Sequence, residues 1–296
     1  MQPVSKHEAL ARLMSSSDVD HVRQGITLII ALQQPGLLAL YTDGVAVHDD
    51  ALVIRRGYFR TTVSGGHQVF AALLLARHAG WLDTVTQLHF DDLMSVSRMG
   101  DLEGLADLET LASLRFRFTL GVKRLEGLPV LPGLTSLVIR SRTLTHLGDL
   151  TTLPALTNLS ITYSNALTDL SSLQVSPGLT TLSLEGCTNL VDLTGLAHLG
   201  QLRHLFLRGC TSVKTLRPLQ CLPSLTHLDL SYCAGLVDLT SLPPLSSLTT
   251  LSVEGCSALV SLGDLTRFPA LQTVNTVRCR ALRHRPRLAR RVEPQS

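Results

Sequence analysis

Leucine recurs at a fixed interval through most of the chain after residue 84. Seven segments share the pattern Leu-x-x-Leu-x-Leu or a close variant of it, and they begin at Leu134, Leu156, Leu179, Leu202, Leu225, Leu248 and Leu271. The first interval is 22 residues and the next five are 23 residues each. Two further segments, LASLRF from Leu111 and VTQLHF from Val85, extend the series to nine. A fixed period of roughly 20 to 50 residues is the sequence signature of a protein built from stacked structural units.

Within each segment the pattern indicates a short β-strand. Side chains alternate between the two faces of a strand. We expect the leucines at the first, fourth and sixth positions to point into the interior and the third, fifth and seventh positions to point outward. The rest of each unit must return to the start of the next strand. Prolines fall in this return path, where a missing N–H is tolerated, at Pro154, Pro223, Pro243, Pro244 and Pro269. We therefore expect 3-10 turns or short loops on that side, not full helices.

These residues resemble the leucine-rich repeat family, whose units follow Leu-x-x-Leu-x-Leu-x-x-Asn/Cys-x-Leu. The segments LTTLSLEGCTNL and LTTLSVEGCSAL match that pattern position for position. The short unit is similar to bacterial internalin-like and plant-resistance-like repeats. The resemblance covers about residues 85–280. It implies an α/β fold, a curved right-handed solenoid of about nine leucine-rich repeats with a parallel β-sheet on its concave face.

Residues 1–84 lack the repeat and predict a small α+β capping region. The segment DVDHVRQGITLIIAL has apolar residues at helical spacing, with Asp18 placed to cap its start and Pro35-Gly36 to end it. VAVHDDALVI indicates a hairpin and HQVFAALLLARHAGWL a second helix. A solenoid end exposes a slice of its interior, which a terminal unit must cover. The predicted covering face consists of Val69, Phe70, Leu73, Leu74 and Trp81. A separate functional domain is the alternative.

Five of the six cysteines occupy one slot of the repeat, at Cys187, Cys210, Cys233, Cys256 and Cys279. In the family that the chain resembles, Asn or Cys in this slot points inward and hydrogen-bonds to the backbone of its neighbour. Because successive strands lie ~4.8 Å apart, we expect the five to form one row. A straight row does not converge on the tetrahedral geometry that zinc prefers, and burial disfavours a reactive thiolate. We expect reduced, structural thiols, with no metal and no cofactor.

Composition favours a protein without a membrane span. Hydrophobic residues make up 45% and aromatic residues only 4%, so leucine must fill most of the interior. No apolar stretch approaches the roughly 20 residues needed to cross a bilayer, and the first residues do not form an export signal. Only Lys6, Lys123 and Lys214 of the 26 basic residues are lysine. These features lead us to expect a cytoplasmic, bacterial protein.

The net charge of +3 hides an asymmetry, because the segment from Arg278 to Arg291 contains seven arginines and no acid. We expect the Arg-rich tail, residues 281–296, to be solvated or to contact a partner. Binding of nucleic acid or an anionic surface is the alternative, since arginines pair with phosphates, through Arg280, Arg283, Arg285, Arg287, Arg290 and Arg291. No cap follows the last repeat, so contact with a second copy of the chain at this end is a further hypothesis.

No set of residues indicates a catalytic site. The motifs HDD from His48 and HFDD from His89 lack a nucleophile or a set of ligands, and SGG from Ser64 lacks the rest of a phosphate-binding loop. His204 and His227 occupy equivalent positions in neighbouring repeats and should lie side by side, as surface imidazoles or, alternatively, as a shared ligand or metal pair. An effector enzyme that joins such repeats to a catalytic domain is a less favoured class, because neither chain end supplies an evident one.

The outward positions of the strands are the best candidate site. Arginine and aromatic residues usually contribute most to protein interfaces. The candidate partner-binding residues are Arg115, Arg117, Arg140, Tyr163, Glu185, His204, Phe206, Arg208, His227, Asp229 and Glu254. We expect a non-catalytic protein-binding module or scaffold, with a signalling, defence, effector or assembly role, whose partner docks on the concave face. A merely solvated sheet face is the alternative for each residue taken singly.

Overall fold

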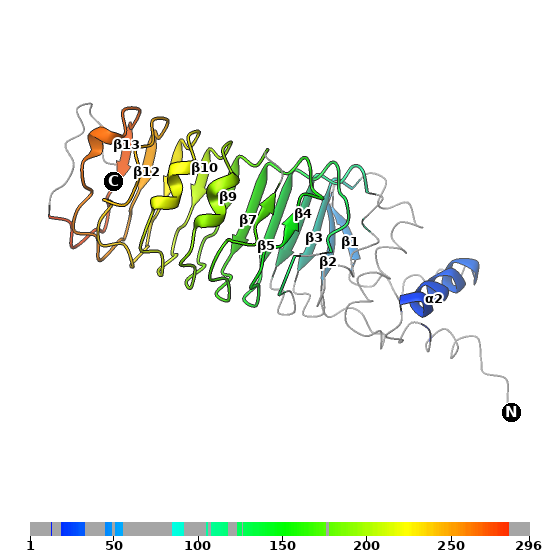
Figure 1. Ribbon diagram of the computed structural model, residues 1–296. Helices are drawn as coiled ribbons and strands as arrows, with labels where there is room; N and C mark the ends of the chain where they lie inside the picture. The colour runs from blue at the N-terminus through cyan, green and yellow to red at the C-terminus, as the bar shows by residue number, and fades with distance from the viewer. Residues whose placement is uncertain are drawn as a thin grey trace.

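Parallel β-strands stacked side by side form the body of the molecule (Figure 1). The computed structural model describes residues 13, 19–32, 45–48, 51–55, 85–91, 105, 108–117, 123–125, 127–175 and 178–283. Within these residues, strands pair in the order β1-β2-β3-β4-β5-β7-β9-β10-β11-β12-β13 to form one eleven-stranded sheet, and β6 pairs with β8.

Within the described residues, helix α2 (Val19–Leu32) precedes the strands. The strands are β1 (Val45–His48), β2 (Ala51–Arg55), β3 (Gln87–Asp91), β4 (Ser113–Arg117), β5 (Ser136–Arg140), β6 (Asp149–Leu150), β7 (Asn158–Thr162), β8 (Gln174–Val175), β9 (Thr181–Ser183), β10 (His204–Phe206), β11 (His227–Asp229), β12 (Thr250–Ser252) and β13 (Thr273–Asn275). Three 3-10 turns lie between the later strands, η2 (Thr194–His198), η3 (Arg217–Cys221) and η4 (Leu265–Arg267).

Neighbouring strands pair at equivalent positions of successive repeats. Leu205 of β10 pairs with Leu228 of β11, and Leu228 pairs with Leu251 of β12. Each of the nine segments that begin between Val85 and Leu271 supplies one strand of this parallel ladder, from β3 to β13 with β6 and β8 excepted. The predicted solenoid of about nine repeats with a parallel sheet is therefore confirmed.

The interior is a single column of leucine that runs the length of the solenoid. Side chains alternate along each strand, so that in β5 Leu137 and Ile139 are fully buried while the residues between them are half-buried. Buried residues from Val85 to Phe268 form one continuous core. Burying a leucine side chain contributes about 2 kcal/mol, so the repeated aliphatic positions supply most of the stabilisation, with Phe116 and Phe268 as buried aromatic members of the core.

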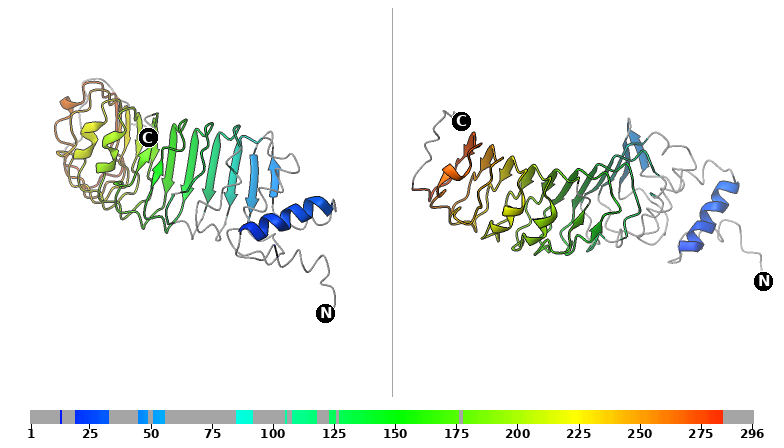
Figure 2. Two further views of the ribbon diagram at one scale, coloured as in Figure 1. Left: turned by 45° about the vertical axis from the view of Figure 1, so that its right-hand side comes forward. Right: turned by 45° about the horizontal axis from the view of Figure 1, so that its top comes forward.

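The return path on the other side of the sheet contains short turns. Figure 2 shows the strands on one side of the molecule and the returning segments, with the 3-10 turns, on the other. In η2 the buried residue is Leu196 and in η3 it is Leu219. The expectation of 3-10 turns or loops on this side is confirmed.

The five cysteines of the repeat slot lie at equivalent positions of successive repeats. Cys187, Cys210, Cys233 and Cys256 are fully buried, and Cys279 is partly buried. Each thiol donates a hydrogen bond to a main-chain carbonyl oxygen of the preceding repeat, at S···O distances of 2.9 to 3.5 Å. Further upstream Ser164 occupies the slot, and its buried hydroxyl has no hydrogen-bond partner among the described residues.

Burial also determines the acidity of these thiols. It raises the pKa of Cys187 and of Cys256 to about 11, and the pKa of Cys233 to about 12. All six cysteines are free thiols. The raised pKa values keep Cys187, Cys233 and Cys256 protonated near neutral pH. Because the thiolate is the reactive form, burial makes these thiols poor nucleophiles.

The first strands extend the repeat sheet beyond what the sequence indicated. The helix and the hairpin expected in residues 1–84 are present, as α2 and as the antiparallel pair β1 and β2. In addition, β2 pairs in parallel with β3, with Ala51 opposite Gln87, so the hairpin continues the sheet of the solenoid. The expected second helix and its covering face, Val69 to Trp81, lie outside the described residues.

The opposite end of the core is less well covered. Leu271, Val274 and Leu282 pack against the core but are only partly buried. Among the described residues, no helix combines the length and the apolar character needed to cross a membrane.

Candidate protein-binding site

The structure places the candidate residues along one surface, the outward side of the large sheet. In β4 the pattern is half-buried, buried, exposed, buried, exposed, so Arg115 and Arg117 project into solvent. Arg208 and His227 are exposed, whereas Arg140, Glu185, His204, Phe206, Asp229 and Glu254 are half-buried. We call this outward side of strands β3 to β13 the concave face. Arg115 and Arg117 lie near its first repeats, several strands away from Arg208.

His204 and His227 are adjacent, as their equivalent positions indicated. The two ring centroids are 4.7 Å apart and the planes are inclined by 55°. Burial lowers the pKa of His204, and the charges of His227 and Arg203 lower it further. Within the described residues, no group of three or more histidine, cysteine or acidic side chains is arranged to hold a metal ion.

The edge of the concave face is formed by a row of residues with left-handed backbone conformation. The residue that follows the seventh strand position has a φ of +56° to +72° in six successive repeats, at Tyr163, Gly186, Gly209, Tyr232, Gly255 and Arg278. Each of the first five donates its backbone N–H to a carbonyl oxygen in the next repeat, at 2.7 or 2.8 Å. We call these six residues the left-handed row. The 22-residue unit that begins at Leu134 lacks this residue, which accounts for its shorter length.

Side chains in the left-handed row are costly, because this conformation destabilises a non-glycine residue by roughly 1–2 kcal/mol. Tyr163, Tyr232 and Arg278 nevertheless adopt it. Backbone strain of this kind is held in place by surrounding contacts and often accompanies functional sites.

Each tyrosine stacks between an arginine and a glycine. The guanidinium carbon of Arg140 lies 4.3 Å from the centroid of the Tyr163 ring, and that of Arg208 lies 4.5 Å from the centroid of the Tyr232 ring. Such cation–π contacts contribute about 0.5–1 kcal/mol at exposed sites. On the side of the next repeat, the Tyr163 ring lies against Gly186, where a Cβ atom would be 2.9 Å from Cδ1 of the ring. The Tyr232 ring lies in the same way against Gly255, at 2.7 Å.

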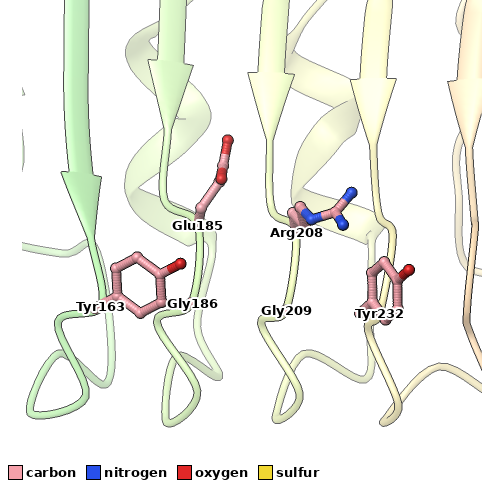
Figure 3. A pocket seen from close by; sticks show the side chains of 6 residues that line it. All are labelled: Tyr163, Glu185, Gly186, Arg208, Gly209 and Tyr232. Atoms are coloured by element: carbon pink, nitrogen blue, oxygen red, sulfur yellow. The ribbon is translucent and has the colours of Figure 1, made fainter.

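A shallow pocket of about 200 Å³ lies between the two tyrosines. Gly186 and Gly209 form its floor, Tyr163 and Tyr232 stand at its ends, and Glu185 and Arg208 line its side (Figure 3). A Cβ atom on Gly209 would meet only the backbone of Gly186, at 3.7 Å, so the space above Gly209 is open. We call this pocket the glycine notch.

The two charged side chains of the notch point in different directions. Figure 3 shows Arg208 directed toward Tyr232 and the Glu185 carboxylate turned away from the Tyr163 ring. Among the described residues, neither charge has an ion-pair partner and the Glu185 carboxylate accepts no hydrogen bond. The notch thus offers one carboxylate, one guanidinium and a phenol hydroxyl to a bound group.

The next tyrosine along the row is part of a closed polar network. The Tyr232 hydroxyl donates to the Glu254 carboxylate at 2.7 Å and accepts from the Arg278 guanidinium at 2.9 Å. Arg278 and Glu254 also form an ion pair at 3.5 Å. Tyr163, Glu185, Arg208 and Glu254 are among the residues predicted from sequence, whereas Tyr232, Arg278 and the two glycines are not. Glycine in three of six equivalent slots was the signal that could have revealed the row.

No protein-family model and no curated protein matches the sequence. Among solved structures, the leucine-rich repeat domain of the type III effector XopL is similar, with 18% identity, coverage of 91% of this chain and 88% of that chain, and a TM-score of 0.40. The functional domain of InlJ from Listeria monocytogenes, described as including a cysteine ladder, shares 20% identity over 69% of this chain and 56% of that chain, with a TM-score of 0.30. A leucine-rich repeat protein of Leptospira interrogans shares 16% identity over 62% of this chain and 49% of its own length, with a TM-score of 0.30.

The fold itself is evident from the chain. The repeat period, the parallel strands paired at equivalent leucines and the row of inward thiols all follow one unit. The chain therefore has the leucine-rich repeat fold.

Proposed function

We propose that this chain is a non-catalytic protein-binding module and that its partner docks on the concave face. The observation that carries the proposal is the set of arginines and tyrosines presented on this one face of a rigid sheet, with Arg115, Arg117 and Arg208 exposed and two tyrosines fixed by stacking. Arginine and tyrosine are enriched among the residues that dominate protein interfaces. Side chains already held in place lose less entropy on binding.

The chemistry of the described residues supports recognition over catalysis. The buried thiols have raised pKa values, which disfavour a thiolate nucleophile. His204 and His227 contact each other and lie beside Thr181 and Thr226. Neither histidine is hydrogen-bonded to an acid that would orient it as a general base, within the part of the chain that the structure describes.

Nucleic-acid binding through the Arg-rich tail stays a hypothesis of lower standing. Of the arginines named for it, only Arg280 and Arg283 are described, and both are exposed. The neighbouring Arg278 is engaged by Tyr232 and Glu254. Contact with a second copy at the last repeat is likewise a hypothesis, and no observation favours it over a different partner.

Charge removal at the first repeats tests the docking proposal. We expect the triple variant Arg115→Ala, Arg117→Ala and Arg140→Ala to lose at least about tenfold in partner affinity, since Arg anchors commonly contribute more than 1 kcal/mol each. The measurement is affinity capture from the native host followed by binding of the purified partner.

The matched control lies on the opposite side of the solenoid. Lys214→Ala combined with Arg217→Ala removes exposed positive charge there, and it should leave partner affinity unchanged. Both variants should retain the circular-dichroism spectrum of the wild type. Capture of no partner, or equal loss in both variants, would reject docking on the concave face.

A further inference from the structure

The glycine notch and the closed network around Tyr232 are two copies of one arrangement, three repeats apart. Tyr163 corresponds to Tyr232 and Glu185 corresponds to Glu254, each pair at the same repeat position. Arg140 stacks on the first tyrosine as Arg208 stacks on the second. The rings also lie alike, each against the glycine of the following repeat.

The two copies differ at the third member of the network. In the second copy Arg278 supplies a guanidinium that binds both the Tyr232 hydroxyl, at 2.9 Å, and the Glu254 carboxylate, at 3.5 Å. The corresponding residue in the first copy is Gly209, which has no side chain. The space that a guanidinium would enter is the open space above Gly209 in the notch.

The first copy is left with unused hydrogen-bonding groups. Among the described residues, the Tyr163 hydroxyl makes no hydrogen bond and the Glu185 carboxylate has no partner, although their counterparts are joined at 2.7 Å. Glu185 is turned away from Tyr163 (Figure 3), and it can reach the notch by a change of side-chain rotamer. Staggered rotamers exchange readily at half-exposed positions.

We propose that the glycine notch binds the guanidinium of an arginine side chain from the protein partner, in the place that Arg278 occupies in the second copy. This inference rests on the proposed docking function. A guanidinium is planar and has several fixed N–H donors, so it can bind a carboxylate and a phenol oxygen together. A lysine ammonium is a compact charge that lacks this fork. The pocket volume of about 200 Å³ admits a guanidinium with part of its aliphatic chain.

Arg208 opposes the bound charge and therefore limits affinity. Its counterpart in the second copy is Val277, which has no charge. The Arg208 guanidinium is held against the Tyr232 ring, away from Glu185, which reduces the repulsion. Replacement of Arg208 by the residue of the second copy should accordingly strengthen arginine binding.

The probe is the capped peptide acetyl-Gly-Arg-Gly-amide, with a citrulline peptide of the same shape and no charge as its match. The full chain carries labelled tyrosine, and because it contains only four tyrosines, each ring signal can be assigned by substituting one tyrosine at a time. We expect the Tyr163 signal to shift saturably with a Kd of roughly 10 mM, as is normal for a single exposed contact. The citrulline peptide should bind at least about tenfold more weakly. An absent Tyr163 shift up to ~50 mM, or equal shifts with both peptides, rejects the site.

Two pairs of variants locate the binding. Glu185→Gln should abolish the response, whereas Glu254→Gln, the same change in the closed copy, should preserve it. Gly209→Arg should occupy the notch from within and prevent peptide binding, and Arg278 shows that the backbone accepts arginine at a φ of +61°. Arg278→Gly should open the second copy, so that the Tyr232 signal now responds to the peptide. Retained binding in Gly209→Arg would overturn the assignment.

Failure of this inference can be separated from failure of docking. A partner that depends on Arg115 and Arg117 but binds Gly209→Arg as tightly as wild type leaves docking intact and rejects the arginine site. A Tyr163 signal that moves without peptide when tail arginines are replaced, by Arg285→Gln with Arg287→Gln, would assign the notch to the chain's own tail and reject the partner arginine.

Discussion

Single residues at the edge of the sheet decide what the concave face can present. The left-handed row would be expected to contain only glycine, and where it does the surface is open, as at Gly209. Where a tyrosine occupies the row, its ring packs against the glycine at the equivalent position of the next repeat, because a Cβ atom on that residue would overlap the ring. Each aromatic position therefore specifies two residues in neighbouring repeats.

Alanine substitutions at the two floor glycines of the notch should distinguish the cost of the left-handed backbone from the cost of a steric contact with the Tyr163 ring. Gly209→Ala should lower the free energy of unfolding by about 1 kcal/mol, since only the left-handed backbone opposes it. Gly186→Ala should cost roughly 2 kcal/mol, because the added Cβ also meets the Tyr163 ring. Urea unfolding measures both. The double variant Tyr163→Ala with Gly186→Ala should fall close to Gly209→Ala, and equal losses in the two single variants would contradict the proposed seating of the ring.

At the scale of the element, an aspartate opens several of the return turns, at either of two positions of the repeat. Its carboxylate accepts a hydrogen bond from the backbone N–H two residues later, at 2.8 to 3.1 Å, in the turns that begin at Asp149, Asp169, Asp192, Asp238 and Asp264. Hydroxyl and backbone donors lower the pKa of Asp149, Asp238 and Asp264, with a hydroxyl from the threonine two residues on as the main cause. The ionised carboxylate is therefore the form of each aspartate that stabilises its turn.

The pH dependence follows from the direction of these shifts. Because the folded pKa lies below the ordinary value of 3.8, the carboxylates contribute stability above pH 3.8 that is lost as the pH falls through the folded pKa. We expect the free energy of unfolding to decline below pH 3.8. Asp149→Asn combined with Asp238→Asn and Asp264→Asn should make the decline shallower, and urea unfolding across this range measures it. Glu109→Gln, at an exposed acid that takes no part in the aspartate turns, is the control and should leave the slope unchanged.

At the scale of the whole molecule, each repeat contacts chiefly its two neighbours, so stability accumulates along one direction. The sheet runs without a break from β1 to β13 across the expected boundary at residue 84. The last repeat has a neighbour on one side only among the described residues, and its leucines are correspondingly less buried.

Position along the solenoid should therefore set the cost of a core truncation. Leu205→Ala, at a fully buried residue of a middle repeat, should lower the free energy of unfolding by about 3–4 kcal/mol. Leu271→Ala, at a half-buried residue of the last repeat, should cost roughly 1–2 kcal/mol. Thermal and urea unfolding of both variants test this. Equal costs would show that the last repeat is packed as fully as the middle ones.

The repeat itself could be predicted from sequence, and the notch could not, for physical reasons. A period of 23 residues places Leu205, Leu228 and Cys233 without knowledge of any contact, since equivalent positions must stack. The pairing of β2 with β3 joins segments that share no repeat motif, so the leucine pattern could not predict it. The arginine–tyrosine stacks depend on which way an exposed side chain leans between repeats. Periodicity predicts the position of the Cα atom of such a side chain, whereas packing against the neighbouring repeats determines where its terminal atoms lie.

The spacing of the two tyrosine copies gives the molecule a built-in unit of length. Three strand separations amount to ~14 Å, which an extended polypeptide spans in about four residues. The Arg278→Gly variant has an open notch at both copies. It would therefore bind two arginines of one partner only where their spacing matches the distance between the two notches. Adding further blocks of three repeats would add further notches at the same spacing. An extended partner strand with arginines at that spacing would then bind with an avidity that increases with each added block.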